Sequence, residues 1–143
     1  MKFYIATDHA GVVIKDDVKE MLKAKGAEVI DLGPDSTDRV NYTDFAHKLS
    51  EKVLSDEGSF GILICGTGIG MSLAANKHSG IRAALCHDYY TAEMARAHND
   101  ANVLCFGQRV CGLGVIESML EAWCETSFEG GRHQERVNLI EKF

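Results

Sequence analysis

The stretch of sequence that decides the fold is Phe60-Gly61-Ile62-Leu63-Ile64-Cys65-Gly66-Thr67-Gly68-Ile69-Gly70-Met71. Its aliphatic residues, 62–64, are typical of a strand that is buried on both faces. Glycines then alternate with other residues, and residues 71–77 have the character of the first turns of a helix. Glycines let the backbone approach a ligand, and free N–H groups at a helix start attract anions. The stretch therefore predicts an anion-binding turn between a strand and a helix.

A thiol, Cys65, lies where the predicted strand ends and the glycine turn begins. This setting favours the thiolate, which is the reactive form of cysteine. The alternative is a tight turn of small residues beside one more buried cysteine, because turn glycines and buried cysteines are both common. From the stretch alone, both interpretations stay open.

Length and composition indicate one ordinary globular domain spanning residues 1–143. The net charge of −6 argues against a nucleic-acid surface, which needs a basic stripe. No apolar run approaches the roughly 20 residues of a membrane span, and the N-terminus lacks a signal-peptide pattern, so we expect a cytoplasmic protein. The five cysteines include no C-x-x-C pair, which makes a disulfide framework or a closed zinc site unexpected.

Segments typical of strands and helices alternate along the chain. Strands are predicted at residues 2–7, 27–32, 60–65, 81–86 and 103–106. Helices are predicted at residues 12–25, 42–54, 71–77, 88–98, 113–126 and about 132–142. We expect Asn41 to cap the helix at 42–54, with Asp44 completing a capping box. The alternation predicts a doubly wound (Rossmann-like) α/β fold, a three-layer αβα sandwich with a five-stranded parallel sheet.

In such folds the ligand lies outside the carboxyl ends of the strands. Asp8 and His9 follow the first strand, and residues 65–70 follow the third, so we expect them to share one crevice. His98 ends a helix that starts at this edge, which places it at the opposite edge of its own sheet. Two interpretations remain: His98 works in the crevice of a neighbouring subunit, or it is a favourable cation at a helix C-terminus.

Arg132 and Arg136 are four residues apart at the head of the last predicted helix, so they share one face. Two guanidinium groups can grip a phosphate, and Arg109 after the fifth strand is a third candidate. The alternative is a solvated charged face, the commoner fate of arginine pairs.

The chemistry that these residues permit is covalent or proton-transfer chemistry at a carbonyl. A thiolate at Cys65 can act as nucleophile or base, and the amides of the glycine turn can hold an oxyanion or enediolate. The turn is no P-loop, because Lys-Ser/Thr is missing after it. It matches a dinucleotide fingerprint only loosely, since it follows the third strand, and Asp88, near the spacing of a ribose-binding acid, is better explained as a helix cap.

Several short motifs carry a family resemblance over nearly the whole chain. They are Asp8-His9-Ala10-Gly11, Gly61-Ile62-Leu63-Ile64-Cys65-Gly66-Thr67-Gly68-Ile69-Gly70, Ala74-Ala75-Asn76-Lys77, Gly80-Ile81-Arg82-Ala83, Arg96-Ala97-His98-Asn99-Asp100, Asn102-Val103-Leu104 and Gly130-Gly131-Arg132-His133. In this order they resemble the type B ribose-5-phosphate isomerases, which form one sugar-phosphate isomerase family with the galactose-6-phosphate isomerase subunits. The resemblance implies interconversion of D-ribose 5-phosphate and D-ribulose 5-phosphate, a step of the pentose phosphate pathway, without a metal or an organic cofactor.

The resemblance also implies a role for each site residue. Cys65 is the base that moves a proton between C1 and C2 through an enediolate, Thr67 helps to shuttle the hydroxyl proton, and His98 opens the furanose ring with Asp8 assisting. The other expected site residues are Gly66, Gly68 and Gly70 at the enediolate, His9, Arg109, Arg132 and Arg136 at the phosphate, and Tyr42 and Asn99 beside the sugar. Some family members have Ser at the position of Cys65 and use a Glu near the position of Ala74, so this chain resembles the Cys branch.

The family is dimeric or tetrameric with sites shared between subunits, so the resemblance implies a homodimer or tetramer in which the C-terminal helix contributes to the site or the dimer. Allose 6-phosphate and galactose 6-phosphate remain alternative substrates within the family. Two other classes also remain open: a non-catalytic module that binds a sugar phosphate or nucleotide, and a redox sensor that uses Cys65.

Overall fold

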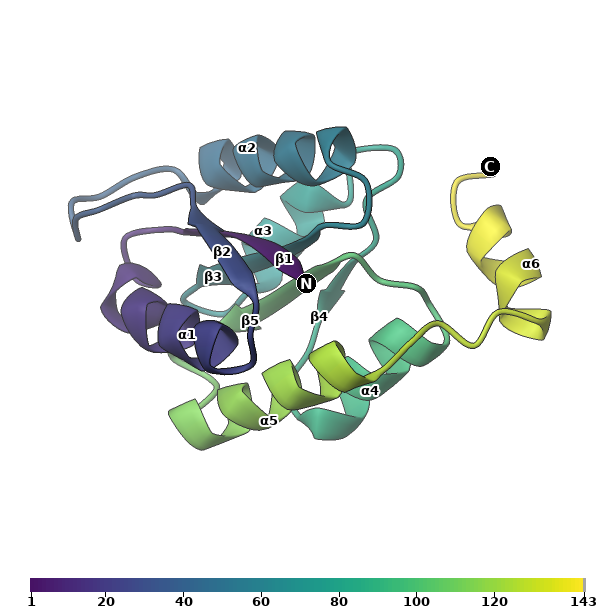
Figure 1. Cartoon of the computed structure of the whole chain (residues 1–143). Helices are drawn as coiled ribbons and strands as arrows, with labels where there is room; N and C mark the ends of the chain where they lie inside the picture. Colours follow the sequence, from purple (N-terminus) through teal and green to yellow (C-terminus); the bar gives the residue numbers. More distant parts are fainter. Residues whose placement is uncertain (143) are drawn as a thin grey trace.

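Five parallel strands form one sheet in the order β2-β1-β3-β5-β4 (Figure 1). The strands are β1 (Lys2–Thr7), β2 (Glu28–Asp31), β3 (Phe60–Cys65), β4 (Ala83–Leu85) and β5 (Val103–Gly107). The structure is a computed structural model that describes residues 1–142, so Phe143, the last residue of the expected domain, lies outside the described residues. The parallel pairings confirm the predicted sheet.

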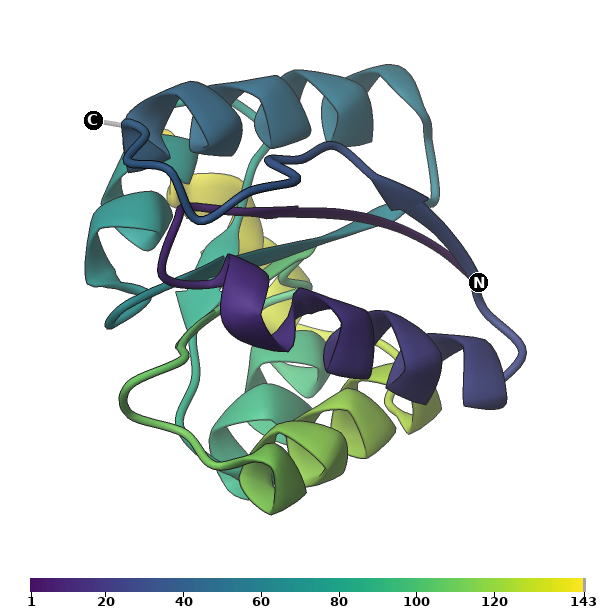
Figure 2. The same ribbon diagram turned by 90° about the vertical axis from the view of Figure 1, so that its left-hand side faces the viewer.

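Helices cover both faces of this sheet, as Figure 2 shows. They are α1 (Val12–Ala24), α2 (Tyr42–Ser55), α3 (Ile69–Ala75), α4 (Tyr89–Ala97), α5 (Leu113–Glu125) and α6 (Arg132–Leu139). The helices α1, α4 and α5 pack on one face, and α2 and α3 pack on the other. This layering confirms the predicted doubly wound αβα sandwich. Within residues 1–142, no helix combines the length and the apolar character that crossing a membrane would require.

The side chains of β3 enter two hydrophobic cores, one on each face of the sheet. Ile62 and Ile64 belong to the core beneath α1, α4 and α5, whereas Leu63 and Cys65 belong to the core beneath α2 and α3. All three aliphatic side chains are fully buried, and each such burial contributes about 1.5–3 kcal/mol. The aliphatic run thus fixes β3 between β1 and β5 and places Cys65 at its carboxyl end.

The structure differs from the predicted elements mainly at their ends. Of the strand predicted at 81–86, only Ala83–Leu85 is strand, because β4 is an edge strand that pairs with β5 alone. The helix α3 begins at Ile69 instead of residue 71, directly after the glycine turn. The helix α6 ends at Leu139, short of the predicted end near residue 142.

The predicted capping box at α2 is wrong, although Asn41 is the N-cap residue as predicted. The Asn41 side chain makes no capping bond, and the N–H of Asp44 donates to the backbone oxygen of Asn41 at 3.2 Å. A capping box normally has Glu or Gln at that position, and Asp is one methylene shorter. A capping box is present at α4, where the N–H of Thr91 donates to Asp88 Oδ1 at 2.7 Å, which confirms Asp88 as a helix cap.

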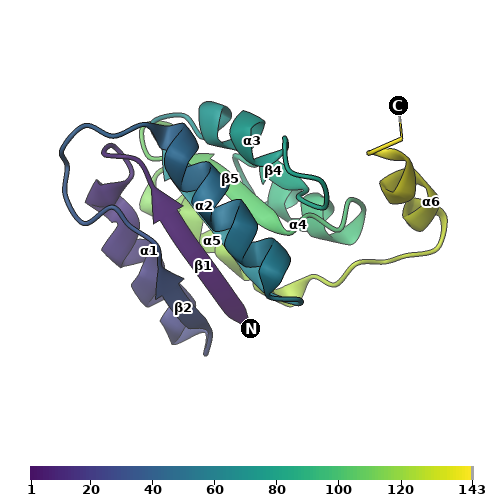
Figure 3. The ribbon, with the colours of Figure 1, turned by 90° about the horizontal axis from the view of Figure 1, so that it is seen from above.

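The helix α6 stands apart from the two helix layers, at the end of an extended segment that follows α5 (Figure 3). One backbone hydrogen bond ties this segment to the body: the N–H of Glu129 donates to the oxygen of Ala97 at the end of α4, at 3.0 Å. Gly130 and Gly131, with φ values of 65° and 55°, then turn the chain into α6. The start of α6 is therefore positioned by the end of α4.

Candidate active site

The carboxyl ends of β1, β3 and β5 bring the first group of predicted site residues together. Thr7 pairs with Ile64 and Cys65 with Gly107, so the segments that follow these strands start side by side. The N–H of Asp8 donates to the oxygen of Ile64 at 3.1 Å, which joins the exit of β1 to the end of β3. This edge is the crevice that the topology predicted for Asp8, His9 and residues 65–70.

Asp8 is a buried carboxylate that holds its own loop. Its Oδ1 accepts hydrogen bonds from the N–H groups of Ala10 and Gly11, both at 2.9 Å, and the residue is 7% exposed. A Cβ atom at Gly11 would lie 2.4 Å from the oxygen of Ile64, so only glycine fits here. The neighbouring His9 accepts a hydrogen bond at Nδ1 from the N–H of Val40, at 3.4 Å, which links this loop to the segment before α2. Asp8 is therefore fixed at the edge of the crevice.

The glycine turn directs a backbone amide at the thiol of Cys65. The N–H of Gly68 donates to Cys65 Sγ at 3.1 Å, and Cys65 is 5% exposed. Gly68 has φ +79°, and a Cβ atom there would lie 2.7–2.9 Å from atoms of Leu85 and Phe106. The turn is thus pressed against the end of β5 in a conformation that other residues rarely adopt. The amide that faces the sulfur depends on glycine at this position.

The other four cysteines have thiols that burial keeps in the protonated form. Burial raises the pKa of the Cys86 thiol to about 12, and it also raises the pKa of the thiols of Cys105, Cys111 and Cys124. These four side chains therefore stay protonated near neutral pH and serve as small apolar groups. Of the five cysteines, Cys65 is the one that follows a strand into the crevice.

Arg109 and Tyr42 flank the two ends of the glycine turn. A Cβ atom at Gly66 would lie 3.3 Å from a guanidinium nitrogen of Arg109. The backbone N–H of Arg109 donates to the backbone oxygen of Gly66 at 3.0 Å. A Cβ atom at Gly70 would lie 2.7 Å from the Tyr42 ring. Both side chains are largely exposed, and both stand over the turn. Thr67, at the exposed tip, accepts a hydrogen bond at Oγ1 from the N–H of Ile69 at 3.2 Å.

His98, Asn99, Arg132 and Arg136 do not join this crevice within one chain. The chain returns from α4 to the amino end of the sheet, where the N–H of Gly61 donates to the oxygen of Asn102 at 2.9 Å. Cys65 lies four residues farther along β3, about 13 Å away at the usual rise per residue. The predicted site is therefore divided between the two edges of the sheet, as the topology argument for His98 required.

The sequence analysis missed two residues that lie beside His98. His133 stacks on it, with ring centroids 4.1 Å apart, and the carboxylate of Glu129 approaches both rings. Glu129 and His133 are four residues apart across the start of a predicted helix. This spacing could have indicated that their side chains lie close together.

The arginines divide into two groups by their partners. Arg82 and Arg96 both pair with Asp100, at 3.2 and 3.0 Å, so their charge is used within the fold. Within residues 1–142 the structure pairs Arg39, Arg109, Arg132 and Arg136 with no carboxylate, and all four are exposed. The second group is therefore available to an anion.

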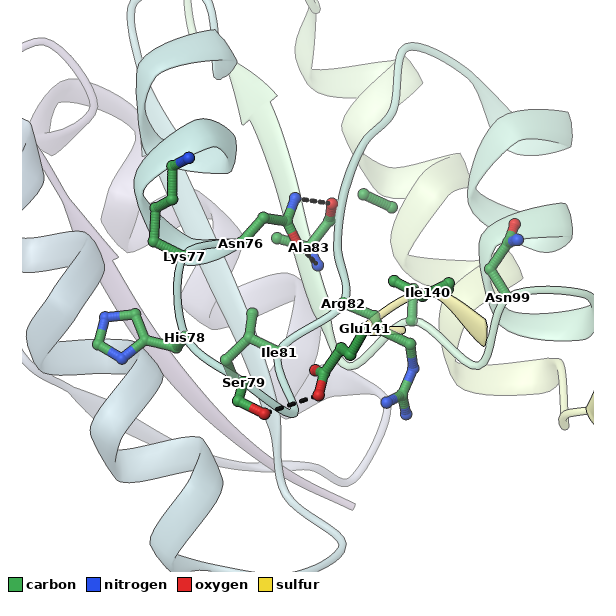
Figure 4. Close-up of a pocket in the computed structure, with 12 residues that line it drawn as sticks. Asn76, Lys77, His78, Ser79, Ile81, Arg82, Ala83, Asn99, Ile140 and Glu141 are labelled. Carbon is green, nitrogen blue, oxygen red and sulfur yellow. Dashed lines mark hydrogen bonds between the residues drawn. The ribbon is translucent and has the colours of Figure 1, made fainter. Parts of the chain in front are cut away.

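A cavity of about 670 Å³ lies away from Cys65, between the segment after α3 and the C-terminal segment (Figure 4). Its lining includes Asn76, Lys77, Arg82, Asn99, Ile140 and Glu141. Glu141 closes one side by accepting a hydrogen bond from the Ser79 hydroxyl at 2.6 Å. Of the predicted site residues, this cavity contains only Asn99.

Replacing Gly68 by alanine should destabilise the turn. A positive φ costs a non-glycine residue about 1–2 kcal/mol, and overlap with the backbone of Phe106 costs about 1–3 kcal/mol more. We expect Gly68→Ala to lower the free energy of unfolding by about 2–5 kcal/mol in denaturant titrations. The control is Gly114→Ala in α5, where nothing lies within 4 Å of the added Cβ and stability should stay the same or rise by up to about 1 kcal/mol. Equal stabilities of the two variants would contradict the strain at Gly68.

Comparisons with known proteins show which family the chain resembles over nearly its whole length. A family model described as Ribose/Galactose Isomerase matches residues 3–140. Ribose-5-phosphate isomerase B of Escherichia coli (strain K12) is 45% identical over 139 residues, which cover 97% of this chain and 93% of that protein.

Solved structures give the same result. Ribose-5-phosphate isomerase B of Clostridium thermocellum superposes with a TM-score of 0.95 at 48% identity, covering 98% of this chain and 95% of the other. Type B ribose 5-phosphate isomerase of Trypanosoma brucei has a TM-score of 0.95 at 44% identity, covering 98% and 96%.

Proposed function

The chain belongs to the ribose/galactose isomerase family, and from that premise we propose that it interconverts D-ribose 5-phosphate and D-ribulose 5-phosphate. The observation that carries the proposal is the contact between the Gly68 amide and Cys65 Sγ at the edge that also holds Asp8. An aldose–ketose isomerase needs a base beside C2 and donors for the oxygens of the intermediate. The thiol of Cys65 and the amides of the glycine turn are suited to these two roles. The reaction would be a step of the pentose phosphate pathway.

In the proposed reaction the Cys65 thiolate removes the proton from C2 of the open-chain aldose. The electron pair moves into the C1–C2 bond, and the carbonyl oxygen on C1 becomes an enediolate oxygen. Thr67 helps to move the hydroxyl proton from O2 to O1, and Cys65 returns its proton to C1, which completes the ketose. A positioned base commonly contributes about 10²–10⁴-fold in rate.

The amides of Gly66, Gly68 and Gly70 are suited to stabilise the enediolate. They belong to a turn that packs closely against Phe106 and Tyr42. Fixed donors need no reorganisation when negative charge develops, so their contribution to catalysis is usually large.

The substrate enters as a furanose, so its ring has to open before the proton transfer. We assign this step to His98: its imidazole takes the proton from the C1 hydroxyl, the bond between C1 and the ring oxygen breaks, and the imidazolium then gives the proton to that oxygen. Asp8 assists, since its carboxylate is held at the crevice by two amide donors. Asn99, next to His98, and Tyr42 line the sugar.

The phosphate is assigned to His9, Arg109, Arg132 and Arg136. Arg109 stands over Gly66, and Arg132 and Arg136 are exposed on α6 without a carboxylate partner among residues 1–142. Binding energy from the remote phosphate can be used to lower the barrier at the reacting carbons.

The division of these residues between two edges of the sheet supports a homodimer or tetramer with shared sites. Each site would combine Cys65 of one subunit with His98, Asn99, Arg132 and Arg136 of another. The helix α6, which stands apart from its own subunit's layers, would contribute its arginines to the neighbour (Figure 3).

Shared sites predict that two inactive variants restore activity when they are mixed. His98→Asn and Cys65→Ala damage opposite halves of a site, so a mixed dimer has one intact site and one with both changes. With random subunit exchange, half of the dimers are mixed, and we expect about a quarter of the unmodified activity. The control is a mixture of Cys65→Ala with Asp8→Asn. Both changes lie in the same half of the site, so mixing should restore no activity. Failure of His98→Asn and Cys65→Ala to rescue each other at every ratio would place the whole site in one chain.

The direct test of the function compares ribose 5-phosphate with allose 6-phosphate and galactose 6-phosphate in a coupled assay. Ribose 5-phosphate should be the best substrate, because the galactose enzyme of this family has two different subunits and this chain carries Cys65, His98 and the arginines together. In D₂O, deuterium should enter at C2 of ribose 5-phosphate. No exchange would favour a module that only binds sugar phosphates.

A further inference from the structure

We propose that His98, Glu129 and His133 form a binding site for a divalent transition metal such as Zn²⁺, and that the bound metal inhibits the enzyme. The three side chains offer two imidazole nitrogens and one carboxylate oxygen that lie within 4.8 Å of one another. The metal site rests on the positions of these side chains and on a rotation of the His98 ring, and it is independent of the proposed function. The inhibition rests on the proposed function, because it requires His98 to open the sugar ring.

Two of the distances within the cluster, those from Glu129 to each imidazole, match a tetrahedral metal site. Glu129 Oε2 lies 3.5 Å from His98 Nε2 and 3.3 Å from His133 Nε2. With metal–ligand bonds of about 2.0–2.2 Å, neighbouring ligands of a tetrahedral zinc are about 3.3–3.6 Å apart. Two imidazoles and one carboxylate form a common ligand set of zinc with the fourth position open, whereas Mg²⁺ and Ca²⁺ prefer oxygen ligands.

His133 supplies the buried ligand of the cluster. The residue is 7% exposed, and its Nε2 has no hydrogen-bond partner within residues 1–142, because the nearby Glu129 oxygen does not meet the geometry of a hydrogen bond. A buried polar nitrogen without a partner is costly, and a metal ion at this point would satisfy it.

The backbone holds the three ligands on different segments in fixed positions. Glu129 is tied to the end of α4 by its N–H bond to Ala97, and the N–H of His98 donates to the oxygen of Met94 at 2.9 Å. His133 lies in the first turn of α6, where its N–H donates to the oxygen of Gly130 at 3.0 Å. The site would therefore connect the end of α4 to the start of α6.

Metal binding requires one ring to leave the stack. The His98 and His133 rings are nearly parallel, with 11° between their planes, so their nitrogen lone pairs do not converge on one point. The His98 side chain is 37% exposed, whereas the His133 side chain is 8% exposed, so His98 is the ring that can turn. Turning His98 toward the metal would remove it from the sugar, and its lone pair would be occupied. The metal would thus block ring opening.

The experiment measures metal binding and activity separately. Binding of Co²⁺ is followed by its visible absorption in Cys65→Ser protein, which removes the reactive thiol as a competing ligand, and Zn²⁺ is then used to displace it. We expect saturation at one ion per chain and a loss of affinity of at least about 10-fold in Glu129→Gln and in His133→Gln. Because His133 is buried and its replacement can disturb folding, the exposed Glu129 gives the decisive variant.

His78→Gln is the matched control for adventitious binding to surface histidines. His78 Nε2 lies 2.7 Å from His47 Nδ1, which makes this the other close histidine pair in the described chain. Its loss should leave the Co²⁺ affinity of the proposed site unchanged. Equal affinity in Glu129→Gln and unmodified protein, or a loss confined to His78→Gln, would overturn the site.

Inhibition is measured with ribose 5-phosphate in unmodified protein. Zn²⁺ should lower activity at the concentrations that displace Co²⁺, EDTA should restore it, and Mg²⁺ should have no effect. Full activity when the site is saturated with metal would overturn the proposed inhibition, whereas the proposed metal-binding site would stand. If the protein isomerises no sugar phosphate, the proposed function fails, and the Co²⁺ titration still decides whether the metal site exists.

Discussion

Cys65→Ala should lower kcat for ribose 5-phosphate by about 10²–10⁴-fold, the amount that a positioned base commonly contributes. The variant removes the sulfur that receives the Gly68 N–H at 3.1 Å and leaves the turn itself intact. Arg109, His9 and the arginines of α6 are unchanged, so the affinity for inorganic phosphate should be preserved. The measurements are steady-state kinetics and phosphate calorimetry on the same preparation.

Cys124→Ala is the matched control for this loss. Cys124 lies in α5, is partly buried, and has a thiol whose pKa is raised by burial, so it should stay protonated and unreactive. Its replacement should leave kcat within a factor of about two. Full activity of Cys65→Ala would exclude the thiol as the base, and a parallel loss of phosphate binding would indicate a collapsed site instead of a missing base.

The central strands of the sheet and their exits were predictable because their signals are local. The aliphatic run at 62–64 is buried on both faces, and glycine follows it at the points where the chain has to turn back against β5. The prediction that Asp8, His9 and Cys65 share one edge also follows from topology, since parallel strands end at the same edge. Hence half of the candidate site could be derived from the order of elements alone.

The other half depends on contacts between distant segments, which one sequence does not encode visibly. The stacking of His133 on His98 requires the segment after α5 to be tied to the end of α4 by a single backbone bond. Two smaller errors also arose where the local signal was weak. The strand β4 is short because it pairs with β5 alone, and the capping box at Asn41 is missing because the Asp44 side chain is short. The order of elements indicates that a second copy of the chain could complete the proposed site, but it does not give the position of that copy.

Arg132→Ala should raise KM for ribose 5-phosphate by about 10–100-fold, and KM for unphosphorylated ribose should change little. A hydrogen bond between charged groups contributes about 1.5–3 kcal/mol. Loss of this bond weakens binding of the phosphate group, so KM rises for the phosphorylated sugar. Arg132 is exposed and makes no salt bridge within residues 1–142, so its removal should not destabilise the fold. Arg132→Lys should be intermediate, because lysine keeps the charge but loses the planar fork.

Gln134 offers the matched control on the same helix. It is exposed on α6 and makes a hydrogen bond to Asn138 at 2.9 Å, so Gln134→Ala changes the helix surface without removing a positive charge. Both KM values of Gln134→Ala should match those of the unmodified protein. If Arg132→Ala raises KM equally for the phosphorylated and free sugars, the arginine does not bind the phosphate. In that case α6 would act by holding His133 beside His98, and the assignment of the phosphate would pass to His9, Arg109 and Arg136.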